Sequence, residues 1–386
     1  MRHNTDRILS THVGALPAPQ GMWGKTDIPD AELTAAVADV MKQQKAAGVD
    51  IINEGELTKG GNWVSFINSR LQGFTANTSG NLAKLMSSSA DWQAFEKYYQ
   101  AATASGTLFE ATASAPPQTG NTPRDFVCTG PIVYIGQAAI AREIAITQAA
   151  LDEHDPADVF ITSTAPASLE PGRSNEYYNT EEDYLFALAD AMRVEYEAIA
   201  SAGFMVQVDD AWLAALWDRI GIPMGMAAYR RYCALRMEVL NHALRNIPEE
   251  RVRYHLCWGS WHGPHAHDLP LADIVDILLT VKARTYLIEG ANVRHEHEYR
   301  VWDSVKLPEG KMLAPGVVSH ATTLVEHPAL VCERIMRYAK RLGRENVMAS
   351  TDCGLGLRCH EQIAWAKLRS LSEGAKLASE KLWKSA

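Results

Sequence analysis

The sequence lacks the features that define several classes of protein. Its 386 residues contain no run of about eighteen apolar residues of the kind that crosses a membrane. The opening residues MRHNTDRILS have no apolar stretch after their basic residues, so they do not match a secretory signal. Acidic residues outnumber basic ones, 46 to 37, without the basic excess typical of nucleic-acid binding. We therefore expect a cytoplasmic protein with neither nucleic-acid nor membrane partners.

Cysteine is also sparse. Six cysteines in a chain of this length are too few for a disulfide scaffold, so free thiols or metal ligands are expected. Cys233 and Cys332 lie within helical patterns and are predicted to be buried apolar residues. Cys257 and Cys353 lie at the ends of apolar runs, where we expect metal ligands more than buried apolar residues.

One arrangement recurs along the chain: an amphipathic stretch leads through a small or glycine-containing turn into a short apolar run. This alternation is typical of βα units with a parallel sheet buried on both faces. The predicted strands are 8–14, 49–56, 158–166, 204–210, 253–259, 285–291, 312–319 and 346–354. Eight strands are what a TIM barrel requires. The sequence therefore predicts an α/β fold, a single (β/α)8 TIM barrel over residues 1–386.

Residues 60–156 break this rhythm with stretches rich in serine, threonine, alanine and asparagine, such as FTANTSGNLAKLMSSSA. We expect a long insertion after the second strand, carrying a hairpin around VCTGPIVYIG (127–136). Its apolar content is too low for an independent domain. Elsewhere, Thr180 followed by Asp183 predicts the start of a helix, and 361–383 predicts a final helix.

Polar side chains close most of the predicted strands, and in a barrel these ends meet at one mouth. They are His12, Glu54, Glu56, Asp209, Asp210, His255, Cys257, Glu289, Ser319, His320, Asp352 and Cys353. Burying such groups is costly unless they are paired or bind a metal, so the pattern indicates an enzyme.

The stretch YHLCWGSWHGPHAH (254–267) suggests where a metal would bind. His255 and Cys257 are two residues apart on one strand, so both point the same way. With Glu289 and Cys353 they form a plausible tetrahedral zinc set, because thiolates favour zinc over magnesium or calcium. The residues alone also allow buried structural thiols and a hydrogen-bonded histidine.

A second group of histidines lies in the loops that follow these strands: His262, His265, His267, His295 and His297. Three interpretations remain open. The loops form a lid that excludes water, hold a second metal, or are solvated polar loops anchored by Pro264 and Pro270.

Several blocks resemble a known family. HLC (255–257), YLIEG (286–290) and STDCGLGLR (350–358) resemble the zinc-binding signature of the catalytic barrel of the cobalamin-independent methionine synthase family. Further blocks match in order along the chain: THVGALP (11–17), NEGE (53–56), QVDD (207–210) and APGVVS (314–319). The resemblance implies a zinc ion held by His255, Cys257, Glu289 and Cys353. Zinc in this family holds a substrate thiol as a thiolate, which then attacks an electrophilic carbon.

The resemblance also implies roles for residues at the mouth. Glu56 and Asp209 match positions that hold the amino group of homocysteine, and Gly14 and Ala15 lie in the block of the opening strand. We expect these four to bind substrate, with Asp209 also catalytic.

Two histidines complete the predicted catalytic set. His320 is displaced by one position from the family's histidine, and His12 either contacts the thiol or hydrogen-bonds across the mouth. A sulfonated thiol would need a cation instead, and Arg294 is included among the substrate-binding candidates for that reason, with Lys59 and Arg358 as alternatives.

The sequence also departs from the family. Its length matches one barrel, and TSTAPASLEPGRS (162–174) has no aromatic residue at a position where the family uses tryptophan in its pterin site, so a folate platform is not expected. The loop WGSWHGPHAHDLPL resembles shorter single-barrel relatives, which include epoxyalkane:coenzyme M transferase.

The predicted function is zinc-dependent alkyl transfer, with methyl the favoured group, to a thiol such as homocysteine. The alternatives are zinc–thiolate opening of an epoxide and, from another class, a metal-dependent barrel hydrolase or a non-catalytic thiol-binding protein. The expected partners are a small-molecule thiol and an alkyl donor. Assembly into a homo-oligomer is left open.

Overall fold

The computed structural model describes residues 4–19, 22, 25, 27–60, 65–108, 125–356 and 358–383. The strands within this part of the chain are β1 (Ile52–Asn53), β2 (Leu71–Asn77), β3 (Asp125–Tyr134), β4 (Val159–Thr164), β5 (Arg173–Asn175), β6 (Met205–Asp210), β7 (Val252–Leu256), β8 (Thr285–Ile288), β9 (Met312–Val318) and β10 (Ser350–Thr351). The α-helices are α1 (Asp30–Ala46), α2 (Asn81–Ser87), α3 (Ala90–Ala94), α4 (Glu96–Ser105), α5 (Gln137–Ala149), α6 (Glu181–Ser201), α7 (Ile222–Met224), α8 (Met226–Ala243), α9 (Val275–Leu278), α10 (Pro328–Leu342) and α11 (Glu361–Trp383).

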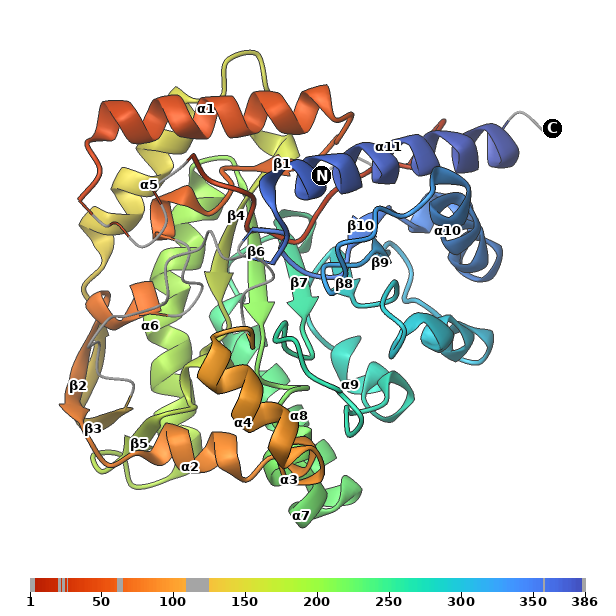
Figure 1. Ribbon diagram of the computed structural model, residues 1–386. Coiled ribbons are helices and arrows are strands. Elements are labelled where there is room, and N and C mark those ends of the chain that lie inside the picture. The colour runs from red at the N-terminus through yellow and green to blue at the C-terminus, as the bar shows by residue number, and fades with distance from the viewer. Residues whose placement is uncertain are drawn as a thin grey trace.

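The core of the fold is a seven-stranded parallel sheet in the order β1-β4-β6-β7-β8-β9-β10. Its strands are buried along almost their whole length, and every residue of β4 and of β9 is buried, as expected for a parallel sheet covered on both faces. Figure 1 shows the longer helices around the outside of this sheet. The predicted α/β class is confirmed.

The first predicted strand, 8–14, does not form a strand ladder. Ser10 makes an isolated parallel bridge with Ala349, and its carbonyl accepts the backbone N–H of Ile51 at 3.1 Å. The segment therefore lies between the two edges of the sheet. Its other donors are taken by side chains: the N–H of Ser10 donates to Asp50 Oδ2 at 2.8 Å. Because a side chain takes this N–H group, the segment keeps only an isolated bridge in place of a strand ladder.

The segment expected to be an insertion contains a second, three-stranded sheet in the order β2-β3-β5. The hairpin predicted around 127–136 does not turn within this stretch, because β3 runs straight through it and pairs antiparallel with the distant β2. The register shifts between Gln72 and Phe74, where Gly73 passes close to the carbonyl of Pro131. A bulge there accommodates the proline, which has no N–H to donate.

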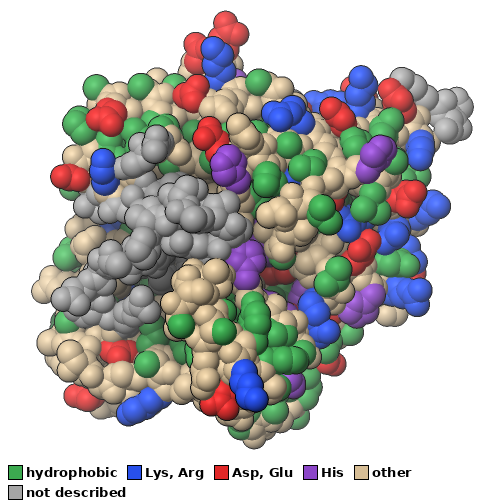
Figure 2. Space-filling model, in the orientation of Figure 1, with side chains coloured by type: hydrophobic (Ala, Val, Ile, Leu, Met, Phe, Trp, Pro, Cys, Tyr) green, Lys and Arg blue, Asp and Glu red, His purple; other side chains and the backbone are tan. Residues whose placement is uncertain are grey.

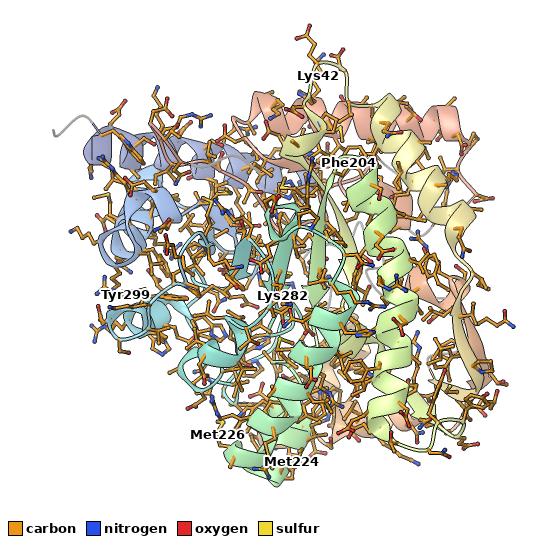
Figure 3. The ribbon with its side chains drawn as sticks, turned by 180° about the vertical axis from the view of Figure 1, so that it is seen from behind. Lys42, Phe204, Met224, Met226, Lys282 and Tyr299 are labelled. Atoms are coloured by element: carbon orange, nitrogen blue, oxygen red, sulfur yellow. The ribbon has the colours of Figure 1, made fainter. Side chains whose placement is uncertain are left out.

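Helices α3 and α4 follow β2 and form a small arm. Figure 1 shows this arm on the side of the molecule to which the arrowheads of β4, β6 and β7 point. In Figure 3, Phe204, which precedes β6, lies nearer α1, and Met224 and Met226 lie at the opposite end of the molecule. The arm is therefore near the carboxyl ends of the strands, where the site residues were predicted.

Two helix predictions agree with the structure. Thr180 caps α6 by accepting the N–H of Asp183 at 3.0 Å, and α11 spans Glu361–Trp383. Among the helices of the described residues, none combines the length and the apolar character needed to cross a membrane.

Candidate metal and substrate site

The residues predicted to bind zinc lie together at the carboxyl ends of the strands. His255 is on β7 and Cys257 directly follows it, Glu289 follows β8, and Cys353 follows β10. The donor atoms of His255, Cys257 and Cys353 all lie within 4.8 Å of one another. The Sγ atom of Cys257 is 3.9 Å from Cys353 Sγ and 3.9 Å from an oxygen of Glu289.

These distances fit a zinc ion. A tetrahedral ion with Zn–S bonds of about 2.3 Å separates its two sulfurs by about 3.8 Å, close to the 3.9 Å between the two cysteines. Both ring nitrogens of His255 are buried and have no hydrogen-bond partner among the described residues. A buried polar atom normally has a hydrogen-bond partner. A metal ion bound to one of these nitrogens would explain why that nitrogen has none. The contact between the two sulfurs lowers the pKa of Cys353 and raises that of Cys257, so without a metal the pair favours a single thiolate, on Cys353.

The Glu289 carboxylate is held from two sides. Asn292 Nδ2 donates to one oxygen at 2.6 Å, and the N–H of Trp258 donates to the other at 3.1 Å. Asp352 accepts the backbone N–H groups of 290–292 and so fixes the turn that presents Glu289. Asn292 was not predicted from the sequence. Its position three residues after Glu289, in EGAN, is the signal that would have identified it.

Two carboxylates, Glu56 and Asp209, lie close to Cys353. Burial, with the negative charge of Glu54 nearby, raises the pKa of Glu56 to about 7. Burial and the neighbouring Glu56 raise the pKa of Asp209 well above its ordinary value, and Cys353 is close enough to contribute to both. Two buried carboxylates that repel each other favour a bound cation. The geometry therefore suits a substrate ammonium group next to the thiol-binding position.

Hydrogen bonds orient this pair. Thr162 Oγ1 donates to Glu56 at 3.2 Å, and Gln207 Nε2 donates to Asp209 at 2.8 Å. Glu56 has a left-handed backbone conformation with φ of 60°, which is uncommon for a residue other than glycine. Strain of this kind concentrates at functional sites.

Gly14 and Ala15 lie between the carboxylates and the last strand. A Cβ atom on Gly14 would lie 2.2 Å from Glu56 Oε1, and the carbonyl of Ala15 accepts the N–H of Gly356 at 2.8 Å. Gly14 therefore leaves room for the Glu56 side chain, and Ala15 connects the opening segment to the loop after Cys353.

We expect Gly14→Ala to raise the KM for the thiol substrate about tenfold or more, because the new methyl group must displace the Glu56 carboxylate. The φ of Gly14 is not in the left-handed region, so the effect is steric and the fold should persist. Steady-state kinetics and zinc content would be measured together. Gly130→Ala is the matched control, since nothing lies within 4 Å of its Cβ position. An unchanged KM in Gly14→Ala would show that the carboxylate does not act on the substrate.

The two predicted catalytic histidines are both buried. Burial lowers the pKa of His12 to about 3 and that of His320 to about 4, so both rings are neutral at pH 7. Gln44 Oε1, which also accepts the N–H of Asn53, bonds His12 Nε2 at 2.7 Å, and Gln44 Nε2 donates to backbone carbonyls. His12 therefore carries its proton on Nε2. The Nδ1 atoms of both rings have no partner among the described residues.

The cations proposed for a sulfonated thiol are differently placed. Arg294 is exposed and donates to the carbonyl of Ala266 at 3.2 Å, away from the carboxylate pair. Lys59 is buried and pairs with Glu54 at 3.2 Å and with Glu143. The charge of Lys59 is therefore already balanced by protein groups.

Hydrogen bonds fix the histidine loops, which carry His262, His265, His267, His295 and His297. His265 and His295 both bond Asp268 at 3.1 Å, and His295 also bonds Glu298 at 2.7 Å. Burial disfavours a charge on His295, but these carboxylates outweigh it and raise its pKa to about 10. His295 is 3% exposed, which does not match a solvated loop. In the part of the chain that the structure describes, the histidine loops form no second metal-binding group.

The α3–α4 arm packs against the same loop. Asp91, in α3, accepts the backbone N–H groups of His265 and Ala266 at 3.0 and 2.8 Å. Tyr99 in α4 donates to Asp91 at 2.8 Å and accepts from Trp261 Nε1 at 3.2 Å. Figure 2 shows histidine side chains on this face among interspersed acidic and basic groups. The sequence did not predict this contact between the arm and the loop after Cys257.

Comparison with curated proteins gives relatives named methionine synthase. The methionine synthase of Thermococcus kodakarensis is 24% identical over 220 residues, and this match spans 57% of either chain. The methionine synthase of Saccharolobus solfataricus is 22% identical over 395 residues, covering 97% of this chain and 96% of that protein. No protein-family model matches the sequence.

The fold is also similar, over nearly the full length, to that of a solved structure. It is a B12-independent methionine synthase from Shewanella sp. W3-18-1 in complex with selenomethionine, with a TM-score of 0.70 and 16% identity, covering 98% of this chain and 99% of that one. The two chains share a fold. The predicted resemblance is confirmed: the chain is similar over nearly its whole length to methionine synthases.

Proposed function

We propose that the protein is a zinc-dependent methyltransferase that transfers a methyl group to the sulfur of homocysteine. The observation that carries this proposal is the position of the Glu56–Asp209 pair next to His255, Cys257, Glu289 and Cys353. A thiol that also carries an ammonium group fits both parts. The names of the relatives support the same substrate.

Each group of residues at the site has a distinct role in the proposed methyl transfer. His255, Cys257, Glu289 and Cys353 would hold zinc, which supplies a thiolate at neutral pH by lowering the pKa of a bound thiol. Glu56 and Asp209 bind and orient the ammonium group, so that the sulfur points to the same place in each turnover. Neutral His320, near Cys353, accepts or passes a proton at Nδ1.

The carboxylate pair also separates this proposal from epoxide opening with a sulfonated thiol. Two buried carboxylates repel a sulfonate, and Lys59, a cation that interacts electrostatically with both of them, is paired with Glu54 and Glu143. An amino-acid thiol is therefore favoured.

The proposed fold is a closed (β/α)8 barrel with 60–156 inserted in a single domain. Residues 8–14 would supply the eighth strand, since Ser10 contacts both edges of the seven-stranded sheet.

The test is a transfer assay with the zinc-loaded protein. Homocysteine is combined in turn with methyltetrahydrofolate, methylcobalamin and S-methylmethionine, and the products are analysed by mass spectrometry. Methionine formed with at least one donor, and lost after chelation of zinc, is the expected result. Hydrolysis of a donor without transfer to any thiol would instead indicate the hydrolase class.

A further inference from the structure

Two imidazole rings in the histidine loops have hydrogen-bond acceptors at all of their nitrogens. His295 Nδ1 lies 2.7 Å from an oxygen of Glu298, and its Nε2 lies 3.1 Å from an oxygen of Asp268. His265 Nδ1 lies 3.1 Å from Asp268, and its Nε2 lies 3.1 Å from the carbonyl of Trp261. Ionised carboxylates and carbonyls only accept hydrogen bonds, so each of these ring nitrogens carries a proton. Both rings are therefore imidazolium cations.

The surrounding charges favour the same protonation state. Burial lowers the pKa of His295, but Asp268 and Glu298 outweigh it and raise the pKa to about 10. Burial also lowers the pKa of His265, and the hydrogen bond and charge of Asp268 raise it above its ordinary value. The second oxygen of Glu298 accepts the backbone N–H of Leu271 at 2.6 Å, which holds this carboxylate in place. His295 is therefore a fixed, buried charge at neutral pH.

This charge lies beside one of the proposed zinc ligands. His295 and His265 both interact electrostatically with Glu289. The His295 ring packs against the indole of Trp258 with the ring centroids 4.6 Å apart, and the backbone N–H of Trp258 donates to Glu289 at 3.1 Å. The imidazolium group is thus one residue removed from the Glu289 carboxylate, without bonding to it.

The proposed ligand set has more negative charge than a zinc ion neutralises. Two thiolates, from Cys257 and Cys353, and the Glu289 carboxylate bring three negative charges to an ion with two positive ones. A buried excess of charge is costly unless another group compensates it. Arg358 interacts electrostatically with the two cysteines, while the histidine pair interacts with Glu289.

We propose that His295, supported by His265, is a positioning residue of the metal centre, held as an imidazolium by Asp268 and Glu298 so that its charge compensates the excess negative charge of the zinc ligands. The histidine loops then act on the metal through their charge and do not bind it. This inference rests on the proposed function, because it takes Glu289 as a zinc ligand.

The experiment is a double-mutant cycle on zinc affinity. The Kd for zinc is measured at pH 8 by competition with a chelator for wild type, His295→Gln, Glu289→Gln and the double variant. His242→Gln is the matched control, since His242 also bonds a carboxylate, Asp190, at 3.0 Å. Thermal unfolding is recorded for each protein. Nitrogen-15 NMR of the wild-type histidine rings, with His295 assigned from its variant, reads the protonation state directly.

Both nitrogens of His295 should carry protons at pH 8, and His295→Gln should raise the Kd for zinc about tenfold or more, since an uncompensated buried charge costs several kcal/mol. In the Glu289→Gln background, where the excess charge is gone, the same change should alter the Kd less than about threefold. His242→Gln should leave it unchanged. If His295→Gln does not fold, His265→Gln goes through the same cycle.

Three results would overturn the inference: a neutral His295 ring at pH 8, an unchanged zinc Kd in His295→Gln, or an equal loss of affinity in both backgrounds. The last result would mean that the histidine only holds the loops together. A wild-type protein that binds no zinc would instead refute the proposed function, so the two failures can be told apart.

Discussion

Replacing Cys257 with alanine should abolish stoichiometric zinc binding and lower the rate of methyl transfer about 1,000-fold or more. Free thiols are only a few per cent thiolate at pH 7, and loss of the metal also removes the positioning of the sulfur, which is worth several further powers of ten. Metal content by mass spectrometry and steady-state kinetics would be measured on the same preparation.

Cys332→Ala is the matched control for this variant. Cys332 is fully buried in α10 but has no part in the cluster of donor atoms. Its loss should cost stability through a small cavity and leave zinc content unchanged. If Cys257→Ala retained one zinc per chain, the assignment of His255, Cys257, Glu289 and Cys353 as ligands would be wrong.

Replacing Asp209 with asparagine should raise the KM for homocysteine about 100-fold, with a smaller effect on kcat. Removing one partner of a buried charge pair typically costs 2–5 kcal/mol, and 1.4 kcal/mol corresponds to a factor of about ten. The control is a change of substrate: 4-mercaptobutyrate lacks the amino group and should be used equally poorly by wild type and variant. A similar loss with both thiols would show that Asp209 supports the fold or the metal instead.

The same pair predicts a pH dependence. Burial raises the pKa of Glu56 to about 7, so this carboxylate becomes neutral as the pH falls below 7 and its attraction for the ammonium group is lost. Between pH 7.5 and 6 the KM for homocysteine should therefore rise as the pH falls, while the substrate amine stays protonated. Glu56→Gln should have a high KM that hardly varies over this range. A KM that falls with acidification would contradict the role of Glu56.

The sequence predicted those features that depend on local pattern. Short apolar runs that end on polar residues identified β4, β6 and β9, because both faces of a parallel strand are buried. The two-residue spacing of His255 and Cys257 placed them on one side of β7. In the opening segment the pattern was insufficient, since Asp50 takes the N–H of Ser10 and the ladder shortens.

Contacts between distant segments could not be read from local pattern. Asp91 meets the loop of His265 across 174 positions of sequence, and Arg358 meets Ser260 across 98. The histidine loops were ambiguous, because His267 meets Asp91 and His295 meets Asp268 only after the loops fold together. Such pairings follow from the tertiary fold and leave no periodic signal.

The proposal that this site activates a thiol through zinc is tested most directly by X-ray absorption at the zinc edge, before and after homocysteine is added. The expected spectrum has two sulfur ligands in the free protein, from Cys257 and Cys353, and three when homocysteine is bound. 4-Mercaptobutyrate should require a much higher concentration to give the same change, because it lacks the ammonium group that Glu56 and Asp209 bind. An unchanged zinc environment at saturating homocysteine would contradict the proposed function.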